Sequence, residues 1–138
     1  MNQTLLLDTC AAMFLLANES MADAANEAIN RSVDAGAPLY VSPITAWEVG
    51  MLSRKGRYRS SLSPQRWFAQ LRVLPGIQIC ELSSDVLMES SFLPGNFHKD
   101  PADRIIAATA REYGYTVMTR DGALLDYGRE GHLSVLEC

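Results

Sequence analysis

The chain has 138 residues, which is the size of one ordinary domain and enough to bury a self-sufficient core. With 48% hydrophobic and 20% charged residues it is globular in composition, and no apolar run approaches the roughly 18 residues that a membrane span needs. The net charge of −4 argues against a protein that holds nucleic acid through a broad positive field, although a metal bound by carboxylates can still bridge to phosphate. We therefore expect one domain, residues 1–138, and no membrane segment.

The first half of the chain alternates short apolar runs with helix-start signals. The expected strands are residues 3–7 and 39–41. The expected helices are residues 11–16, about 21–35, 43–53 and 64 to about 74. Ser20 with Asp23 three residues later predicts a capping box before the second helix, and Gly36 stands where its C-terminal cap belongs. Ser-Pro pairs at 42–43 and 63–64 each supply an N-cap followed by a first-turn proline.

The second half continues the same alternation. The expected strands are residues 77–80, 115–118 and 133–136, and the expected helices are 83–92 and 101–113. Asp100-Pro101 begins the most regular helix, and Gly114 ends it. Strands that alternate with helices need crossover connections, so we predict a single three-layer α/β/α domain with a mainly parallel central sheet. Neither the dinucleotide-binding nor the P-loop glycine motif is present in the sequence.

Four acidic residues stand out in this layout: Asp8, Glu48, Asp103 and Asp121. Three of them follow an apolar strand or begin the helix after one, and a parallel sheet gathers such positions along one edge. Carboxylates collected in this way repel one another until a hard divalent cation neutralises them. The pattern therefore predicts a metal site built from carboxylate oxygens.

Most of these acids also have a purely structural interpretation. Asp8 could cap the helix that follows it, and Asp121-Gly122 could be a plain turn. Asp103 lies three residues after Asp100, so the two could be a helix cap and its partner in the first turn. Both interpretations stay open for these three positions.

Glu48 is harder to explain as a surface residue. Its neighbours on the predicted helix face are Ile44, Met51 and Leu52, so its carboxylate projects from an apolar stripe. Burying a carboxylate without a partner costs several kcal/mol of solvation or raises its pKa strongly. Glu48 therefore needs a compensating cation, either a neighbouring arginine or a metal ion.

Four motifs in order along the chain carry a resemblance to a known family. They are LLLDT at residues 5–9, SPITAWE at 42–48, HKDPADRIIAATA at 98–110 and TRD at 119–121. Together they resemble the PIN domain and, more narrowly, the VapC-type ribonuclease toxins of bacterial toxin–antitoxin pairs. The resemblance spans nearly the whole chain, and the motifs are specific as a set.

The resemblance implies a set of site residues. Asp8, Glu48, Asp103 and Asp121 match the family's metal-binding and catalytic acids, Thr9 and Thr119 match hydroxyl residues that help to hold the site, and Asp100 is an adjacent acid. It further implies metal-assisted hydrolysis of an RNA phosphodiester with Mg²⁺ or Mn²⁺. Glu48 could be a ligand or could orient the attacking water, and the number of ions stays open. One departure is Cys10, where many relatives carry Asn or Ser.

Basic residues near these motifs are candidates for RNA contact. They are Arg54, Lys55, Arg57 and Arg59, with Tyr58 among them, and Lys99 before the helix expected at residues 101–113. A solvated loop explains the first four equally well. His98 could contact the substrate like Lys99, and a loop or capping histidine is the preferred interpretation. By resemblance we expect an RNA substrate, a cognate antitoxin that docks on exposed apolar side chains, and a homodimer.

The remaining signals concern location and rival functions. The first residues lack the basic region of a secretion signal, so we expect a cytoplasmic protein. Cys10, Cys80 and Cys138 are odd in number and form no C-x-x-C pair, which argues against disulfides and a zinc site. A haloacid-dehalogenase-type phosphatase would need an aspartate where Cys10 stands. A PIN-like module that binds RNA or protein without cleavage is the alternative, and the presence of all four acids argues against it.

Overall fold

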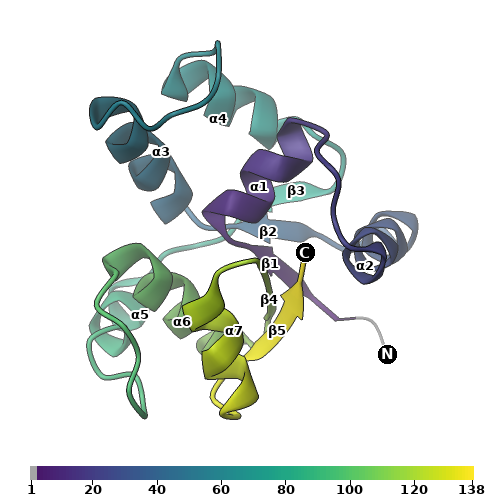
Figure 1. Cartoon of the computed structure of the whole chain (residues 1–138). Helices are drawn as coiled ribbons and strands as arrows, with labels where there is room; N and C mark the ends of the chain where they lie inside the picture. The colour runs from purple at the N-terminus through teal and green to yellow at the C-terminus, as the bar shows by residue number, and fades with distance from the viewer. Residues whose placement is uncertain (1–2) are drawn as a thin grey trace.

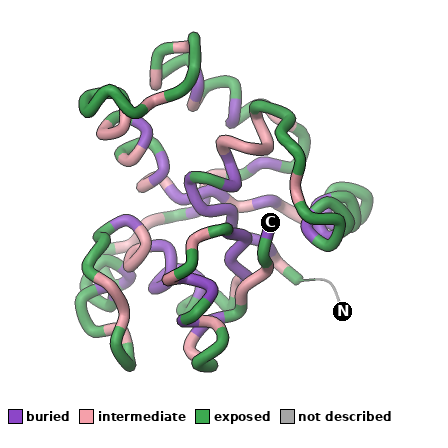
Figure 2. The backbone as a smooth tube through the Cα atoms, in the orientation of Figure 1, coloured by how far each residue is buried: buried purple, intermediate pink, exposed green. Residues whose placement is uncertain are grey.

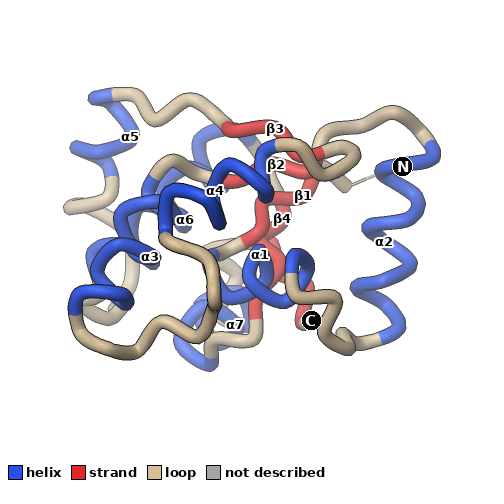
Figure 3. The backbone as a smooth tube through the Cα atoms, turned by 90° about the horizontal axis from the view of Figure 1, so that it is seen from above, coloured by secondary structure: helices blue, strands red, loops and turns tan. Residues whose placement is uncertain are grey.

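The computed structural model describes residues 3–138, and its centre is a sheet of five parallel strands. The strands are β1 (Leu5–Leu7), β2 (Leu39–Val41), β3 (Ile77–Ile79), β4 (Thr116–Thr119) and β5 (Ser134–Glu137). They pair in the order β3-β2-β1-β4-β5, so the first strand lies in the middle of the sheet (Figure 3). Every neighbouring pair is parallel. The predicted parallel sheet is confirmed, with each strand within two residues of its expected place.

Helices form the crossovers between successive strands, as Figure 1 shows. They are α1 (Thr9–Leu16), α2 (Asp23–Asp34), α3 (Ile44–Arg54), α4 (Pro64–Arg72), α5 (Ser84–Glu89), α6 (Pro101–Tyr113) and α7 (Gly122–Arg129). The helix α5 ends three residues earlier than predicted. Within residues 3–138 we find no helix with the length and apolar character required to cross a bilayer.

Alternate strand residues face two separate apolar cores, one on each side of the sheet. Leu5, Leu7 and Val41 pack with α1, α2 and α4, whereas Leu6 and Val117 pack with α6 and α7. All five side chains are fully buried, and the buried strands run through the middle of Figure 2. Because both faces are covered, the central strand β1 is apolar throughout instead of alternating with polar residues. The predicted α/β/α layering is confirmed.

Helix ends follow local capping chemistry at several predicted positions. The Ser63 hydroxyl accepts the Arg66 backbone N–H at 3.2 Å and begins α4, and Asp100 accepts the Asp103 N–H at 3.0 Å and begins α6. Gly114 ends α6 with φ +74°, a left-handed conformation that glycine adopts without a steric penalty. Local sequence is sufficient to place these helix ends.

The capping box predicted at Ser20 and Asp23 is wrong. The helix α2 begins at Asp23, and its N-cap residue Ala22 has no side-chain oxygen to offer. Distant residues hold this segment: the Ala22 N–H donates to the Cys138 carbonyl at 3.0 Å, and the Arg120 guanidinium donates to the Ser20 carbonyl at 2.6 Å. Both partners lie at least 100 residues away in the sequence, so no local pattern could reveal them.

The helix α7 corrects another prediction, because the sequence indicates only a turn at Asp121-Gly122. Asp121 is the N-cap of this helix and accepts the Leu124 N–H at 2.9 Å. Gly128 inside the helix is required by a close approach to the sheet, since a Cβ there would lie 2.4 Å from a methyl group of Val135. Two glycines in a helix of eight residues conceal its helical pattern.

Candidate metal centre

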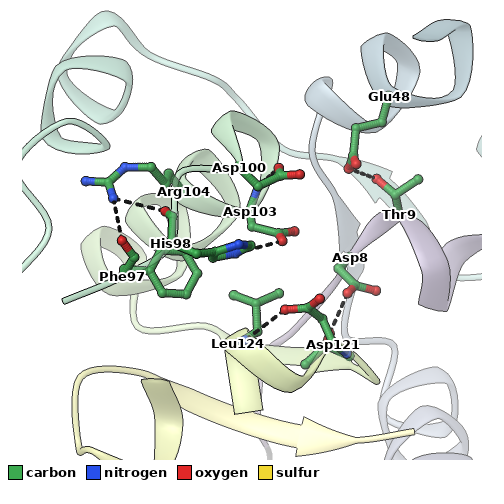
Figure 4. Close-up of polar contacts among 11 residues, drawn as sticks. Asp8, Thr9, Glu48, Phe97, His98, Asp100, Asp103, Arg104, Asp121 and Leu124 are labelled. Carbon is green, nitrogen blue, oxygen red and sulfur yellow. Dashed lines mark hydrogen bonds and ion pairs between the residues drawn. The ribbon is translucent and has the colours of Figure 1, made fainter. Parts of the chain in front are cut away.

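The four predicted acids come from four different segments and face one another at the carboxyl edge of the sheet (Figure 4). Asp8 follows β1 and Asp121 closely follows the neighbouring strand β4, so parallel pairing brings these two together. Asp103 projects from the first turn of α6, and Glu48 comes from the middle of α3. The centre therefore depends on the order of the strands and on the packing of α3 against α6.

Asp8 has both a structural task and a place in this centre. One carboxylate oxygen accepts the Ala11 N–H at 2.8 Å and caps α1, and the other accepts the Thr119 hydroxyl at 2.5 Å. Only 4% of the residue is exposed. Burial raises the pKa of Asp8, while these two hydrogen bonds act in the opposite direction. The predicted cap at Asp8 is confirmed, and the same carboxylate also faces the other acids (Figure 4).

Asp121 is tied to the backbone in a similar way. Its carboxylate caps α7, and its backbone N–H donates to the Thr119 hydroxyl oxygen at 2.9 Å. Thr119 is fully buried and bridges Asp8 to the Asp121 backbone. One hydroxyl therefore fixes the spacing between the ends of two neighbouring strands.

Glu48 lies on the α3 side of the centre, where it meets α1. The hydroxyl of Thr9 donates to the Glu48 carboxylate and lies 3.0 Å from the hydroxyl of Thr45. Burial raises the pKa of Glu48, and the charges of Asp100, Asp8 and Asp121 raise it further. No ion pair within residues 3–138 includes Glu48, so the ion pair with a neighbouring arginine, considered as an alternative, is wrong.

Asp103 and Asp100 have separate tasks. Asp100 is exposed, and its carboxylate caps α6 through the Asp103 backbone N–H. The Asp103 side chain is 16% exposed and accepts no backbone hydrogen bond in the described part of the chain. Burial, followed by the charges of the neighbouring acids, raises the pKa of Asp103 to about 8. The cap explains Asp100 and leaves the Asp103 carboxylate without a structural purpose.

His98 also reaches this centre, which the sequence analysis does not anticipate. Its Nε2 lies 3.0 Å from Asp103 Oδ2, with the imidazole on the opposite side of Asp103 from Glu48 (Figure 4). The only available signal was its position five residues before Asp103, and a loop residue has no periodicity from which its direction can be inferred. His98 lies in a loop as predicted, but its side chain also contacts Asp103, which was not predicted.

The donor atoms fit a divalent cation. Ligand atoms of His98, Asp103 and Asp121 all lie within 4.8 Å of one another, and Asp8 adjoins them in Figure 4. Carboxylate oxygens suit Mg²⁺ and Mn²⁺. Burial is the main cause of the raised pKa values of Asp8, Glu48 and Asp103, and the charges of neighbouring acids raise them further. A bound cation would neutralise that charge.

The candidate RNA-contact residues are all exposed, and they occupy two places. Arg54 ends α3, the next three basic residues lie in the loop before α4, and Lys99 directly precedes Asp100. Lys99 is the one among them that adjoins the acidic residues in sequence. The structure brings the four acids together and does not gather these five basic residues around them.

Comparisons with known proteins place this fold among characterised relatives. The sequence model of the PIN domain matches residues 5–130. Ribonuclease VapC22 of Mycobacterium tuberculosis is 30% identical over 122 residues, which cover 88% of this chain and 89% of that protein.

Solved structures agree on the fold. A chain of VapBC2 from Rickettsia felis, bound to a DNA fragment from its promoter, aligns with a TM-score of 0.67 at 16% identity and covers 97% of this chain and 98% of its own. A toxin–antitoxin complex from Klebsiella pneumoniae contains a chain that aligns with a TM-score of 0.59 at 22% identity, with 96% of each chain covered.

Proposed function

The chain belongs to the PIN domain family, and on that premise we propose that it is a metal-dependent endoribonuclease, the toxin of a toxin–antitoxin pair. The observation that carries the proposal is the convergence of four carboxylates, Asp8, Glu48, Asp103 and Asp121, at one edge of the sheet (Figure 4). Its relative VapC22 is a ribonuclease, which supports RNA as the substrate.

Asp8, Asp103 and Asp121 would hold Mg²⁺ or Mn²⁺, and Glu48 either adds a fourth oxygen or orients the attacking water. Such an ion, when bound, lowers the pKa of a coordinated water and stabilises negative charge on the phosphate oxygens. Of the four acids, Glu48 is the one whose hydrogen bond comes from a side-chain hydroxyl alone, that of Thr9. That contact engages one carboxylate oxygen, so the other is available to a water molecule.

Other residues of the chain prepare these carboxylates. The hydroxyl of Thr119 orients Asp8, and the hydroxyl of Thr9 orients Glu48, so both carboxylates are positioned before an ion or RNA arrives. Asp100 acts through the backbone, because its cap fixes the first turn of α6 and with it the position of Asp103. These contacts reduce the reorganisation needed when the centre is loaded.

We also assign the basic side chains to the RNA backbone. Arg54, Lys55, Arg57, Arg59 and Lys99 are exposed and free to meet phosphates. If they do so, replacing Arg57 and Arg59 by Gln weakens RNA binding and lowers its dependence on salt concentration. Arg66→Gln, an exposed position on α4, is the matched control and is expected to leave both unchanged.

The proposed partner is a cognate antitoxin, and the relative solved in a toxin–antitoxin complex supports this assignment. A hollow of about 440 Å³ lies between α1 and the segment that leads into α4. Its walls include the apolar side chains of Met13, Phe14, Leu62 and Trp67. Such a surface suits the apolar face of an amphipathic helix. We further propose that the chain acts in the cytoplasm as a homodimer of single PIN-like domains, residues 1–138.

Cleavage of RNA by the purified chain tests the proposed function. We expect cleavage with Mg²⁺ or Mn²⁺ and its loss both in EDTA and in Asp103→Asn. Asp34→Asn, which removes an exposed carboxylate at the end of α2, is the matched control and should cleave normally. Cleavage that survives EDTA and Asp103→Asn would exclude the metal mechanism. RNA binding without any cleavage by the native chain would favour the non-catalytic module.

A further inference from the structure

One side chain at the centre is chemically unlike the others. His98 presents a nitrogen, whereas Asp8, Glu48, Asp103 and Asp121 present carboxylates (Figure 4). Although 36% of its side chain is exposed, the Nε2 atom itself is shielded from solvent and lies 3.0 Å from Asp103 Oδ2. The ring therefore turns its outer edge to water and its nitrogen toward the acids.

Arg104, the residue next to Asp103, holds the loop that carries this imidazole. The Arg104 guanidinium donates to the carbonyls of Phe97 and His98, each at 3.2 Å, and its Nε donates to the carbonyl of Ser90 at 2.8 Å. The Phe97 ring packs edge-on against the imidazole, with 4.5 Å between the ring centroids. Because Arg104 and Asp103 share the first turn of α6, the loop and the carboxylate are held in one register.

The spacing also suits ligation. An ion bound at about 2.1–2.2 Å keeps its ligands within about 4.4 Å of one another. The ligand atoms of His98, Asp103 and Asp121 already lie within 4.8 Å, so a shift of a few tenths of an ångström closes the set. A hydrogen bond to Asp103 alone accounts for the 3.0 Å contact, whereas the proximity of Asp121 adds a second carboxylate at a spacing that suits ligation.

We infer that His98 is the nitrogen ligand of this centre and gives it a preference for Mn²⁺ over Mg²⁺. Mg²⁺ binds almost entirely through oxygen and retains its waters, whereas Mn²⁺ accepts imidazole nitrogen more readily. The inference rests on the proposed function in one respect, because it requires a metal to bind among these acids. It adds which ion the site favours and which residue is responsible.

Metal binding by the untagged native chain, without RNA, is the direct test. We expect Mn²⁺ to bind more tightly than Mg²⁺ by calorimetry, and the bound Mn²⁺ to show nitrogen coupling in pulsed EPR. The chain has two histidines, so His98→Gln and His132→Gln assign that nitrogen. His98→Gln should lose the coupling and weaken Mn²⁺ binding about tenfold while changing Mg²⁺ binding much less. His132 packs on Tyr127, so His132→Gln should change neither the nitrogen coupling nor the binding of either ion.

The possible outcomes separate this inference from the function on which it rests. Mn²⁺ that binds the native chain without nitrogen coupling, and binds His98→Gln equally well, overturns the role of His98 and leaves the proposed function intact. Equal weakening of both ions in His98→Gln, with no coupling in the native chain, reduces His98 to a hydrogen-bond partner of Asp103. A native chain that binds neither ion, and whose melting temperature neither ion changes, overturns the proposed metal centre itself. Melting curves in EDTA verify that both variants are folded.

Discussion

The two halves of the acidic centre differ in what else their carboxylates do. Asp8 and Asp121 each accept a backbone N–H and begin a helix, so their charges are compensated by the fold. Asp103 and Glu48 accept no backbone hydrogen bond within residues 3–138. We call the first pair the capped half and the second the uncapped half. The capped half therefore serves both the fold and the proposed site, whereas the uncapped half serves only the proposed site.

Mutations in the two halves should therefore change stability in opposite directions. Removing a carboxylate from the capped half leaves buried donors without partners, which destabilises the chain. Removing one from the uncapped half relieves desolvation and like-charge repulsion, which stabilises the metal-free chain while it abolishes function.

Asp8→Ala should have the largest effect. It removes the cap of α1 and leaves both the Ala11 N–H and the Thr119 hydroxyl without their partner. We expect cleavage to disappear and the free energy of unfolding, measured by urea titration in EDTA, to fall by about 3 kcal/mol. Asp8→Asn is the matched control, because asparagine also caps helices and should lose cleavage with a much smaller loss of stability. If Asp8→Ala were as stable as the native chain, the claim that the capped half stabilises the fold would be wrong.

Asp103→Asn should have the opposite sign. Burial and neighbouring charges raise the pKa of Asp103 to about 8, so at higher pH its carboxylate is ionised at a cost. The neutral amide of similar shape avoids that cost, and we expect a gain of about 1–2 kcal/mol in the free energy of unfolding of the metal-free chain at pH 8.5. Added Mn²⁺ should stabilise the native chain and leave Asp103→Asn unchanged. A variant that is less stable than the native chain in EDTA would contradict the comparison.

The sequence was sufficient for the capped half and insufficient for the geometry of the uncapped half. Asp8 directly follows β1, and Asp121 lies two residues after the neighbouring parallel strand β4, so topology alone brings them together. The position of Asp103 relative to Glu48 depends instead on how α3 packs against α6. Local pattern singled out both residues but does not encode that packing.

His98 shows the limit of sequence reasoning most clearly. The direction of its imidazole is set by hydrogen bonds from Arg104 to two loop carbonyls, and such contacts leave no periodic trace in the sequence. The same reason explains the wrong capping box at Ser20, where the chain is held by Arg120. Both failures concern polar contacts between segments, which hydrophobic periodicity does not encode.

The pH dependence of stability sharpens the second prediction. A carboxyl group whose pKa is raised in the folded state binds its proton more tightly there, so it contributes stability below the unfolded pKa near 3.8 and loses that contribution as the pH rises to about 8. We therefore expect the stability advantage of Asp103→Asn over the native chain to shrink from pH 8.5 toward pH 5. Urea titrations of both metal-free proteins across this range measure the difference. An advantage that is constant with pH would assign it to packing instead of charge.

Asp100 offers the smallest and most discriminating change, because it belongs to the capped class but lies beside the uncapped half. Asp100→Asn keeps an N-cap for α6 and removes one of the charges that raise the pKa of Asp103. We expect a few tenths of a kcal/mol of added stability at pH 8.5 in EDTA, and cleavage that is largely retained. Asp100→Ala loses the cap as well and should cost about 1 kcal/mol. Comparing the two variants separates the capping effect of the Asp100 side chain from the effect of its charge. If both variants lose cleavage completely, Asp100 belongs to the metal centre and not only to the helix that supports it.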